Sequence, residues 1–358
     1  MNPSLDLDGL NTRIGRLFMA GMPGPDLDMG TEALIREYAL GGIILFSRNI
    51  QDPLQLATLC RDLQKMSLQY HGISLFLAVD QEGGRVARLK APFTEFPGQT
   101  EIGKDPDPVT KAKEFARVTA KEMQLVGLNM DLTPVLDVPR GTPEKHLIGR
   151  IFGEDAEAVA SLGCAVIEEL QKNGVMAVAK HFPGLGMADF DPHKQLPEIP
   201  LGQEDLTKVD ILPFKAAVQA GVTGVMSSHA VYPSLDPVNS ATLSHGILTE
   251  LLRKRLGFEG LILTDDLEMG AISLGKGVVD GAVQAFRAGA DILLICQDQR
   301  CVLESIGLFR KKLLVGDIEL ERFRESLDRI AVAKACFLKK RKTVSLAAVK
   351  EYFGEKSL

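Results

Sequence analysis

Short runs of apolar, largely β-branched residues alternate along this chain with segments whose apolar residues recur at helical spacing. The runs are almost continuously apolar, which is typical of parallel strands that are covered on both faces. We expect strands at 17–20, 41–46, 75–80, 128–133, 176–181, 224–229, 261–265 and 291–295. Eight parallel strands separated by helices predict an α/β fold, a (β/α)8 barrel of the TIM type with room for irregularity, rather than an open doubly wound sheet.

Several helical segments have recognisable ends. Asp52 is a typical cap, and Pro53 a typical first-turn residue, for a helix with one apolar face made of Leu56, Leu59, Cys60 and Leu63. A second helix should stop at Gly174 and has its own apolar face, made of Val159, Leu162, Val166 and Leu170. A third is expected to begin at Ser244 and to end near Gly257.

The composition is that of a globular protein. With 358 residues, of which 45% are hydrophobic and 25% charged, the chain can bury one large core. No linker separates two domains, so we expect a single domain over 1–358. A barrel over about 14–316 would be followed by a helical tail over about 317–358 that packs outside it. The basic run at 339–342 is typical of a solvated helix end.

The charges and the cysteines indicate which partners and which cellular compartment to expect. The net charge of −6 does not favour nucleic acid or an anionic membrane. No apolar stretch could span a bilayer, and the first residues do not have the pattern of a signal peptide, so we expect a cytoplasmic protein. The scattered cysteines are expected to be small core residues in a reducing compartment: Cys60, Cys164, Cys296, Cys301 and Cys336. Dinucleotide, P-loop and regularly spaced Cys/His motifs are absent, so neither a cofactor nor a metal is expected.

Polar residues recur at the carboxyl ends of the predicted strands, which is the functional face of such barrels. They are Asp80, Asp131, Lys180, His181, His229 and Asp265. His229 fits a packing or supporting role as well as a direct one. Asp265 and Asp266 are adjacent, so on an extended strand they should point to opposite faces, with one acting and the other structural. The alternative is that both cap the next helix.

Two further stretches bring polar groups together. Between Asp80 and Arg88 a tight loop contains two glycines, where Asp80 could accept from sugar hydroxyls and Arg88 could donate as a fork. A salt-bridged surface turn is the alternative. Further on, Asp191 and His193 are two positions apart in a Gly/Pro-rich loop. A carboxylate partner holds an imidazole in one tautomer, which suits a proton shuttle, although two ordinary loop residues would look the same.

Together these stretches resemble family 3 glycoside hydrolases, specifically the single-domain bacterial β-N-acetylglucosaminidase branch. The resemblance covers nearly the whole chain and rests on motifs in the family's order. They are Gly41-Gly-Ile-Ile-Leu-Phe-Ser-Arg-Asn49, Asp80-Gln-Glu-Gly-Gly-Arg85, Asn129-Met-Asp-Leu-Thr-Pro-Val135, Lys180-His-Phe-Pro-Gly184 and Gly260-Leu-Ile-Leu-Thr-Asp-Asp266.

The resemblance implies a role for each matching residue. Asp265 would be the nucleophile, and His193, supported by Asp191, would be the general acid/base. The N-acetylglucosamine ring would be held by Asp80, Arg88, Arg150, Lys180 and His181. The chain departs from the family in the His193 loop, with Leu185 and Met187 where His and Asp are common and Pro192 where Ser is common.

The implied function is retaining hydrolysis of terminal β-linked GlcNAc, with peptidoglycan fragments as the expected substrate and a monomer or homodimer as the expected state. Four alternatives remain: a phosphorylase that uses phosphate instead of water, catalysis assisted by the substrate's acetamido group, a broader β-glycosidase, and a silent sugar-binding barrel.

Overall fold

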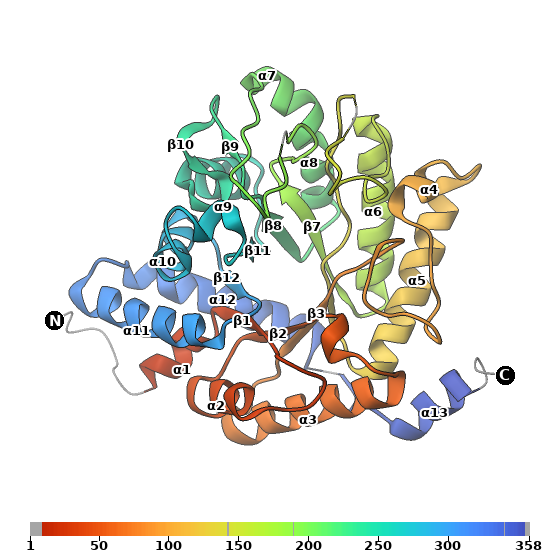
Figure 1. Ribbon diagram of the computed structural model, residues 1–358, viewed down its shortest axis with the longest axis vertical. Coiled ribbons are helices and arrows are strands. Elements are labelled where there is room, and N and C mark those ends of the chain that lie inside the picture. The colour runs from red at the N-terminus through yellow and green to blue at the C-terminus, as the bar shows by residue number, and fades with distance from the viewer. Residues whose placement is uncertain (1–8, 142, 189, 340, 355–358) are drawn as a thin grey trace.

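The computed structural model describes residues 9–141, 143–188, 190–339 and 341–354. Eight strands in this part of the chain close into a barrel, and every neighbouring pair is parallel (Figure 1). The barrel strands are β1 (Phe18–Gly21), β2 (Gly42–Leu45), β3 (Phe76–Val79), β6 (Met130–Asp131), β7 (Met176–Phe182), β8 (Gly224–Ser227), β11 (Leu261–Asp266) and β12 (Ile292–Ile295). Their order around the barrel follows the sequence, which confirms the predicted (β/α)8 fold.

Helices surround the barrel on the outside (Figure 1). The helices are α1 (Leu10–Gly15), α2 (Met29–Tyr38), α3 (Pro53–His71), α4 (Gln99–Gly103), α5 (Pro108–Val126), α6 (Ala156–Lys172), α7 (Gln203–Asp205), α8 (Ile211–Gln219), α9 (Gly270–Ser273), α10 (Val278–Ala288), α11 (Gln299–Val315), α12 (Leu320–Phe337) and α13 (Leu346–Gly354). Four helices of other pitch are η1 (Ser47–Asn49), η2 (Leu206–Asp210), η3 (Ala241–Leu243) and η4 (Gly246–Arg255). Two small hairpins pair β4 (Gln81–Gly83) with β5 (Val86–Ala87) and β9 (Val231–Tyr232) with β10 (Asp236–Ser240). Within the described ranges no helix has the length and apolarity needed to cross a membrane.

The predicted helix ends have the expected chemistry. The side chain of Asp52 accepts from the amides of Leu54 and Gln55 at the start of α3. Gly174, just after α6, has a φ of 73°, which glycine adopts without strain. The helix predicted from Ser244 forms, but η4 is a π-helix, so its hydrogen bonds reach back five residues.

Two other expectations are corrected. The strand predicted at 128–133 is reduced to β6, because Pro134 has no amide hydrogen to donate, although pairing with β7 continues through the carbonyls of Thr133 and Pro134. The cysteines are not all core residues. Cys60 and Cys296 are buried, whereas Cys336 is exposed on the outer side of α12.

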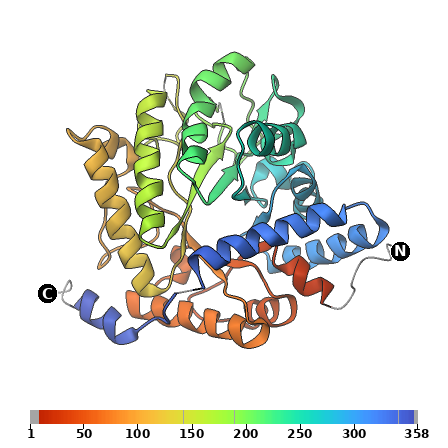
Figure 2. The same cartoon turned by 180° about the vertical axis from the view of Figure 1, so that it is seen from behind.

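The C-terminal helices pack on the outside of the barrel, and α12 lies across the face seen in Figure 2. Asp291, fully buried just before β12, holds α12 in place. Its carboxylate accepts from Ser326 at 2.6 Å and Arg322 at 3.3 Å, both on α12, and from Arg253 of η4. The helix α13 packs against α3 and α5.

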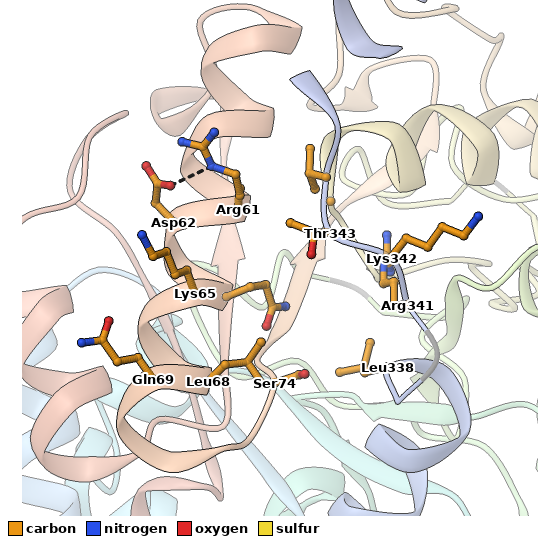
Figure 3. A pocket seen from close by; sticks show the side chains of 13 residues that line it. Arg61, Asp62, Lys65, Leu68, Gln69, Ser74, Leu338, Arg341, Lys342 and Thr343 are labelled. Atoms are coloured by element: carbon orange, nitrogen blue, oxygen red, sulfur yellow. Dashed lines mark hydrogen bonds and ion pairs between the residues drawn. The ribbon is translucent and has the colours of Figure 1, made fainter. Parts of the chain in front are cut away.

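A concavity of about 700 Å³ separates α3 from the segment that follows α12 (Figure 3). The predicted solvated basic run lies on this segment, apart from Lys340, which is outside the described residues. Arg341 corrects the expectation, because it is partly buried and donates to the carbonyl of Leu128. Lys342 extends away from α3 into solvent (Figure 3).

Candidate active site

All eight residues predicted for the site border one cavity of about 430 Å³ at the carboxyl ends of the strands. Lys180 and His181 lie on β7 and Asp265 on β11, while Asp80 directly follows β3. The others come from connecting segments: Arg88 after β5, Arg150 before α6, and Asp191 and His193 between β7 and α7. Residues far apart in the sequence therefore meet because parallel strands end at the same mouth.

A network of charged side chains, hereafter the floor network, is formed by Asp80, Arg88, Arg150 and Lys180, which border the cavity, and by Glu82, which does not border it but bonds two of them. Lys180 is 2% exposed and lies between two carboxylates, 2.8 Å from Asp80 and 2.6 Å from Glu82. Arg150 donates to both oxygens of Glu82, each at 2.8 Å, and Arg88 donates to Asp80 at 3.2 Å. Every buried charge in this network therefore has an opposite partner, as buried ions require.

The floor network holds its members in their charged forms. Burial raises the pKa of Glu82, but Arg150 and Lys180 outweigh it and bring that pKa to about 2. Burial lowers the pKa of Lys180, yet the charges of Asp80 and Glu82 raise it above its ordinary value. Sequence reasoning missed Glu82. It stood in the Asp80–Arg85 motif, but only the β4–β5 hairpin shows that its side chain is buried.

Asp265 lies at the end of β11 with its Oδ2 atom 3.9 Å from Nε2 of His181. Burial raises the pKa of Asp265, but His181 and the backbone amide of Asp266 offset this, and the pKa lies below its ordinary value. The carboxylate is therefore ionised at neutral pH, and at 3.9 Å its contact with His181 is too long for a hydrogen bond.

The neighbouring Asp266 corrects one expectation, because it also borders the cavity. Strict alternation fails here because the register of β11 against β12 shifts between Leu263 and Asp266. The two carboxyl groups still differ. Asp266 Oδ1 accepts from the amides of Glu268 and Cys296, and burial followed by nearby negative charge raises its pKa to about 7. These contacts agree with the predicted structural role for one of the pair.

His181 is oriented by a carboxylate that sequence reasoning missed. Asp137 is fully buried, and its Oδ2 atom lies 2.7 Å from Nδ1 of His181. Its other oxygen accepts from the amides of His181 at 3.2 Å and Leu185 at 2.7 Å. An acid between apolar residues, in Val135-Leu-Asp-Val138, was the available signal, since a buried carboxylate needs such partners.

Two of the remaining polar strand-end residues lie behind this site. His229 is buried, with Nδ1 2.8 Å from the hydroxyl of Thr242 and Nε2 3.0 Å from the carbonyl of Asp266. Asp131 is also buried, and burial raises its pKa well above the ordinary value. Neither side chain is among those bordering the cavity: His229 contacts the backbone of Asp266, which does border it, and Asp131 accepts from the amide of Gln81.

Asp191 and His193 lie on the predicted loop at the mouth. Asp191 Oδ1 accepts from the amide of His193 at 3.0 Å and lies 2.7 Å from its Nδ1 atom. The ring of His193 is 62% exposed. The carbonyls of Pro192 and His193 accept from the amides of Ala271 and Gly270, so α9 holds the loop against the cavity.

No group of three or more His, Cys, Asp or Glu side chains in the described ranges has an arrangement that could hold a metal ion.

Comparison with known proteins places the chain within one family. The sequence profile of the glycosyl hydrolase family 3 N-terminal domain matches residues 10–333. A β-hexosaminidase of Nitrosomonas eutropha is 37% identical over 265 residues, covering 72% of this chain and 74% of that protein. β-Hexosaminidase A of Pseudoalteromonas piscicida is 37% identical over 281 residues, but the chain covers only 46% of its length. The structure of a family 3 β-N-acetylglucosaminidase from Paenibacillus superposes with a TM-score of 0.90 at 34% identity, covering 99% of this chain and 69% of that one.

Proposed function

This chain belongs to glycosyl hydrolase family 3 and is a glycoside hydrolase, and we propose that it is a retaining β-N-acetylglucosaminidase that removes terminal GlcNAc from β-linked glycans. The observation that carries the proposal is that Asp265, whose pKa lies below its ordinary value, and the His193–Asp191 pair border the same cavity. The names of the relatives support the choice of sugar.

In the first step, Asp265 would attack the anomeric carbon while the bond to the leaving group breaks. His193 would give the proton on Nε2 to the departing oxygen. The Nδ1 atom is held by Asp191, so Nε2 is the atom free to transfer a proton. The product of this step is a glycosyl ester of Asp265 and a free alcohol.

In the second step, Nε2 of His193 would take a proton from a water molecule whose oxygen attacks the same carbon. The ester bond breaks, Asp265 leaves as a carboxylate, and the two inversions give retention. The low pKa of Asp265 suits both its attack and its departure.

The sugar being transferred would lie on the floor network. Asp80 would accept from its hydroxyls, Arg88, Lys180 and Arg150 would donate to them, and His181 would contact it beside Asp265. Because each cation of the floor network has a carboxylate partner, the floor can bind a neutral sugar without leaving a charge buried and unpaired. As the natural substrate and place we propose peptidoglycan fragments in the cytoplasm, with 1–358 as one catalytic unit. The five free thiols, one of them exposed, support a reducing compartment.

A slow fluorinated N-acetylglucosaminide tests the proposal, because it accumulates the covalent ester. Mass mapping should place the label on Asp265. A label on another residue would refute the role of Asp265, and activity without any label would favour assistance by the substrate's acetamido group. Asp265→Ala should abolish turnover, and the product formed in phosphate buffer should be free GlcNAc rather than its 1-phosphate.

A further inference from the structure

A second carboxylate–histidine pair lies on the rim of the same cavity. In the segment between β6 and α6, Glu144 Oε2 lies 2.6 Å from both the backbone amide and the Nδ1 atom of His146. Asp191 and His193 are joined by the same two contacts on their own loop. Both histidines border the cavity, so the site carries one local geometry twice.

The two rings differ in their exposure to solvent. The side chain of His146 is 8% exposed, against 62% for His193. Burial, which outweighs the effect of Glu144, lowers the pKa of His146. The ring is therefore neutral at neutral pH, with its proton on Nδ1 facing a carboxylate that can only accept. Nε2 is then a hydrogen-bond acceptor, and it has no partner in the described part of the chain.

The backbone of His146 is also held. Its carbonyl accepts from Arg85 and, at 3.2 Å, from Nη1 of Arg150. Arg85 donates to the carbonyl of Lys145 as well, at 2.9 Å. Through Arg150 the segment is fixed to Glu82 and the floor network. A buried hydrogen-bond acceptor without a partner destabilises the fold. Because the Nε2 atom of His146 is nevertheless held in place, a ligand that donates a hydrogen bond to it would explain the arrangement.

We propose that His146 determines specificity by accepting, at Nε2, a hydrogen bond from a hydroxyl group of the sugar on the leaving-group side. This rests on the proposed function. His146 is near enough to Asp191 for their charges to interact, and the Asp191–His193 pair must lie beside the oxygen that it protonates. A neutral imidazole has no proton to give at Nε2, so the role is binding. The atom is shielded in this structure, and the rim must adjust to admit the hydroxyl, as binding-site side chains commonly do.

The test compares two substrates with the same transferred sugar. N,N′-diacetylchitobiose has hydroxyls on its leaving group, whereas the nitrophenyl leaving group of 4-nitrophenyl N-acetyl-β-glucosaminide has none. In His146→Phe, the ratio of kcat/KM for chitobiose to kcat/KM for the nitrophenyl substrate should fall about tenfold, the loss expected for one hydrogen bond. His146→Gln, which keeps an acceptor, should recover most of the ratio. Should His146→Phe fail to fold, Glu144→Ala frees the ring and should lower the same ratio.

His245→Phe is the matched control. This histidine is 60% exposed, lies 3.9 Å from Glu250 and does not border the cavity, so its replacement should leave the ratio unchanged. An equal loss on both substrates in His146→Phe would indicate a merely structural role and overturn the inference, as would no loss on either substrate. A wild-type enzyme inactive on both substrates would refute the proposed function itself.

Discussion

Replacing Glu82 with glutamine removes one charge from the floor network while keeping the shape of the side chain. Glu82 is 1% exposed and bonds both Arg150 and Lys180, so the variant leaves two buried cations with one fewer anion. Removing one partner of a buried ion pair is strongly destabilising, because the remaining charge stays desolvated.

The magnitude follows from the pKa of Glu82, which falls from 4.5 to about 2 on folding. A carboxyl group whose pKa is depressed in the folded state stabilises that state above its unfolded pKa. The contribution is lost as the pH falls through the folded value. The charge of Glu82 therefore contributes about 3 kcal/mol to the free energy of unfolding at pH 7, and about half of that at pH 3. For a chain of this size, Glu82→Gln should lower Tm by roughly 4 °C at pH 7.

Urea unfolding at pH 7 and at lower pH measures both the loss and its pH dependence. Glu101→Gln is the matched control, because Glu101 pairs with Lys104 at 3.2 Å on the surface with more than half of each side chain exposed. That variant should lose less than about 1 kcal/mol. A Glu82→Gln protein as stable as the wild type at pH 7, or a loss that does not shrink at low pH, would refute the reasoning.

Three further predictions concern the reacting groups. Asp137→Asn should reduce kcat/KM by about tenfold or more, measured on a nitrophenyl substrate, because His181 loses the carboxylate that orients it. His193→Ala should lose about 10²-fold or more on substrates with poor leaving groups and far less on nitrophenyl ones, and equal losses would contradict an acid role. Asp266 has a pKa raised to about 7, so folding disfavours its charge increasingly as the pH rises from 4 to 7. The stability of Asp266→Asn relative to the wild type should therefore improve by roughly 2 kcal/mol between pH 5 and pH 8 in urea unfolding.

The barrel was predictable because its physical signal is local. An apolar run such as 41–46 has few alternatives to a buried parallel strand, and the cap at Asp52 marks a helix end by its own hydrogen bonds. The positions of Asp265 and Lys180 followed from one rule, since strand ends of a parallel barrel share a face.

The supporting shell was not predictable in the same way, because it depends on contacts between distant segments. Glu82 finds Lys180 ninety-eight positions away only after the barrel closes. Asp265 and Asp266 share the cavity because of a register shift between strands, which no single-strand pattern contains. His146 gave no signal, since its burial depends on Arg85 and Arg150 fixing an otherwise irregular segment.

Contacts between distant segments also hold the proposed proton donor, His193, on the same side of the barrel as the proposed nucleophile, Asp265. The loop of His193 leaves β7 where Asp137 binds the amide of Leu185, and it returns to the barrel at Gly270. A Cβ at position 270 would lie 2.9 Å from the carbonyl of His193 and 2.7 Å from that of Lys194, so only glycine allows this approach. Gly270 follows Asp265 by five residues on the same segment. The loop of His193 is therefore held beside the segment of Asp265 by backbone contacts to Gly270 and Ala271 and by the buried carboxylate of Asp137, and none of these contacts uses the side chains of Leu185 or Met187.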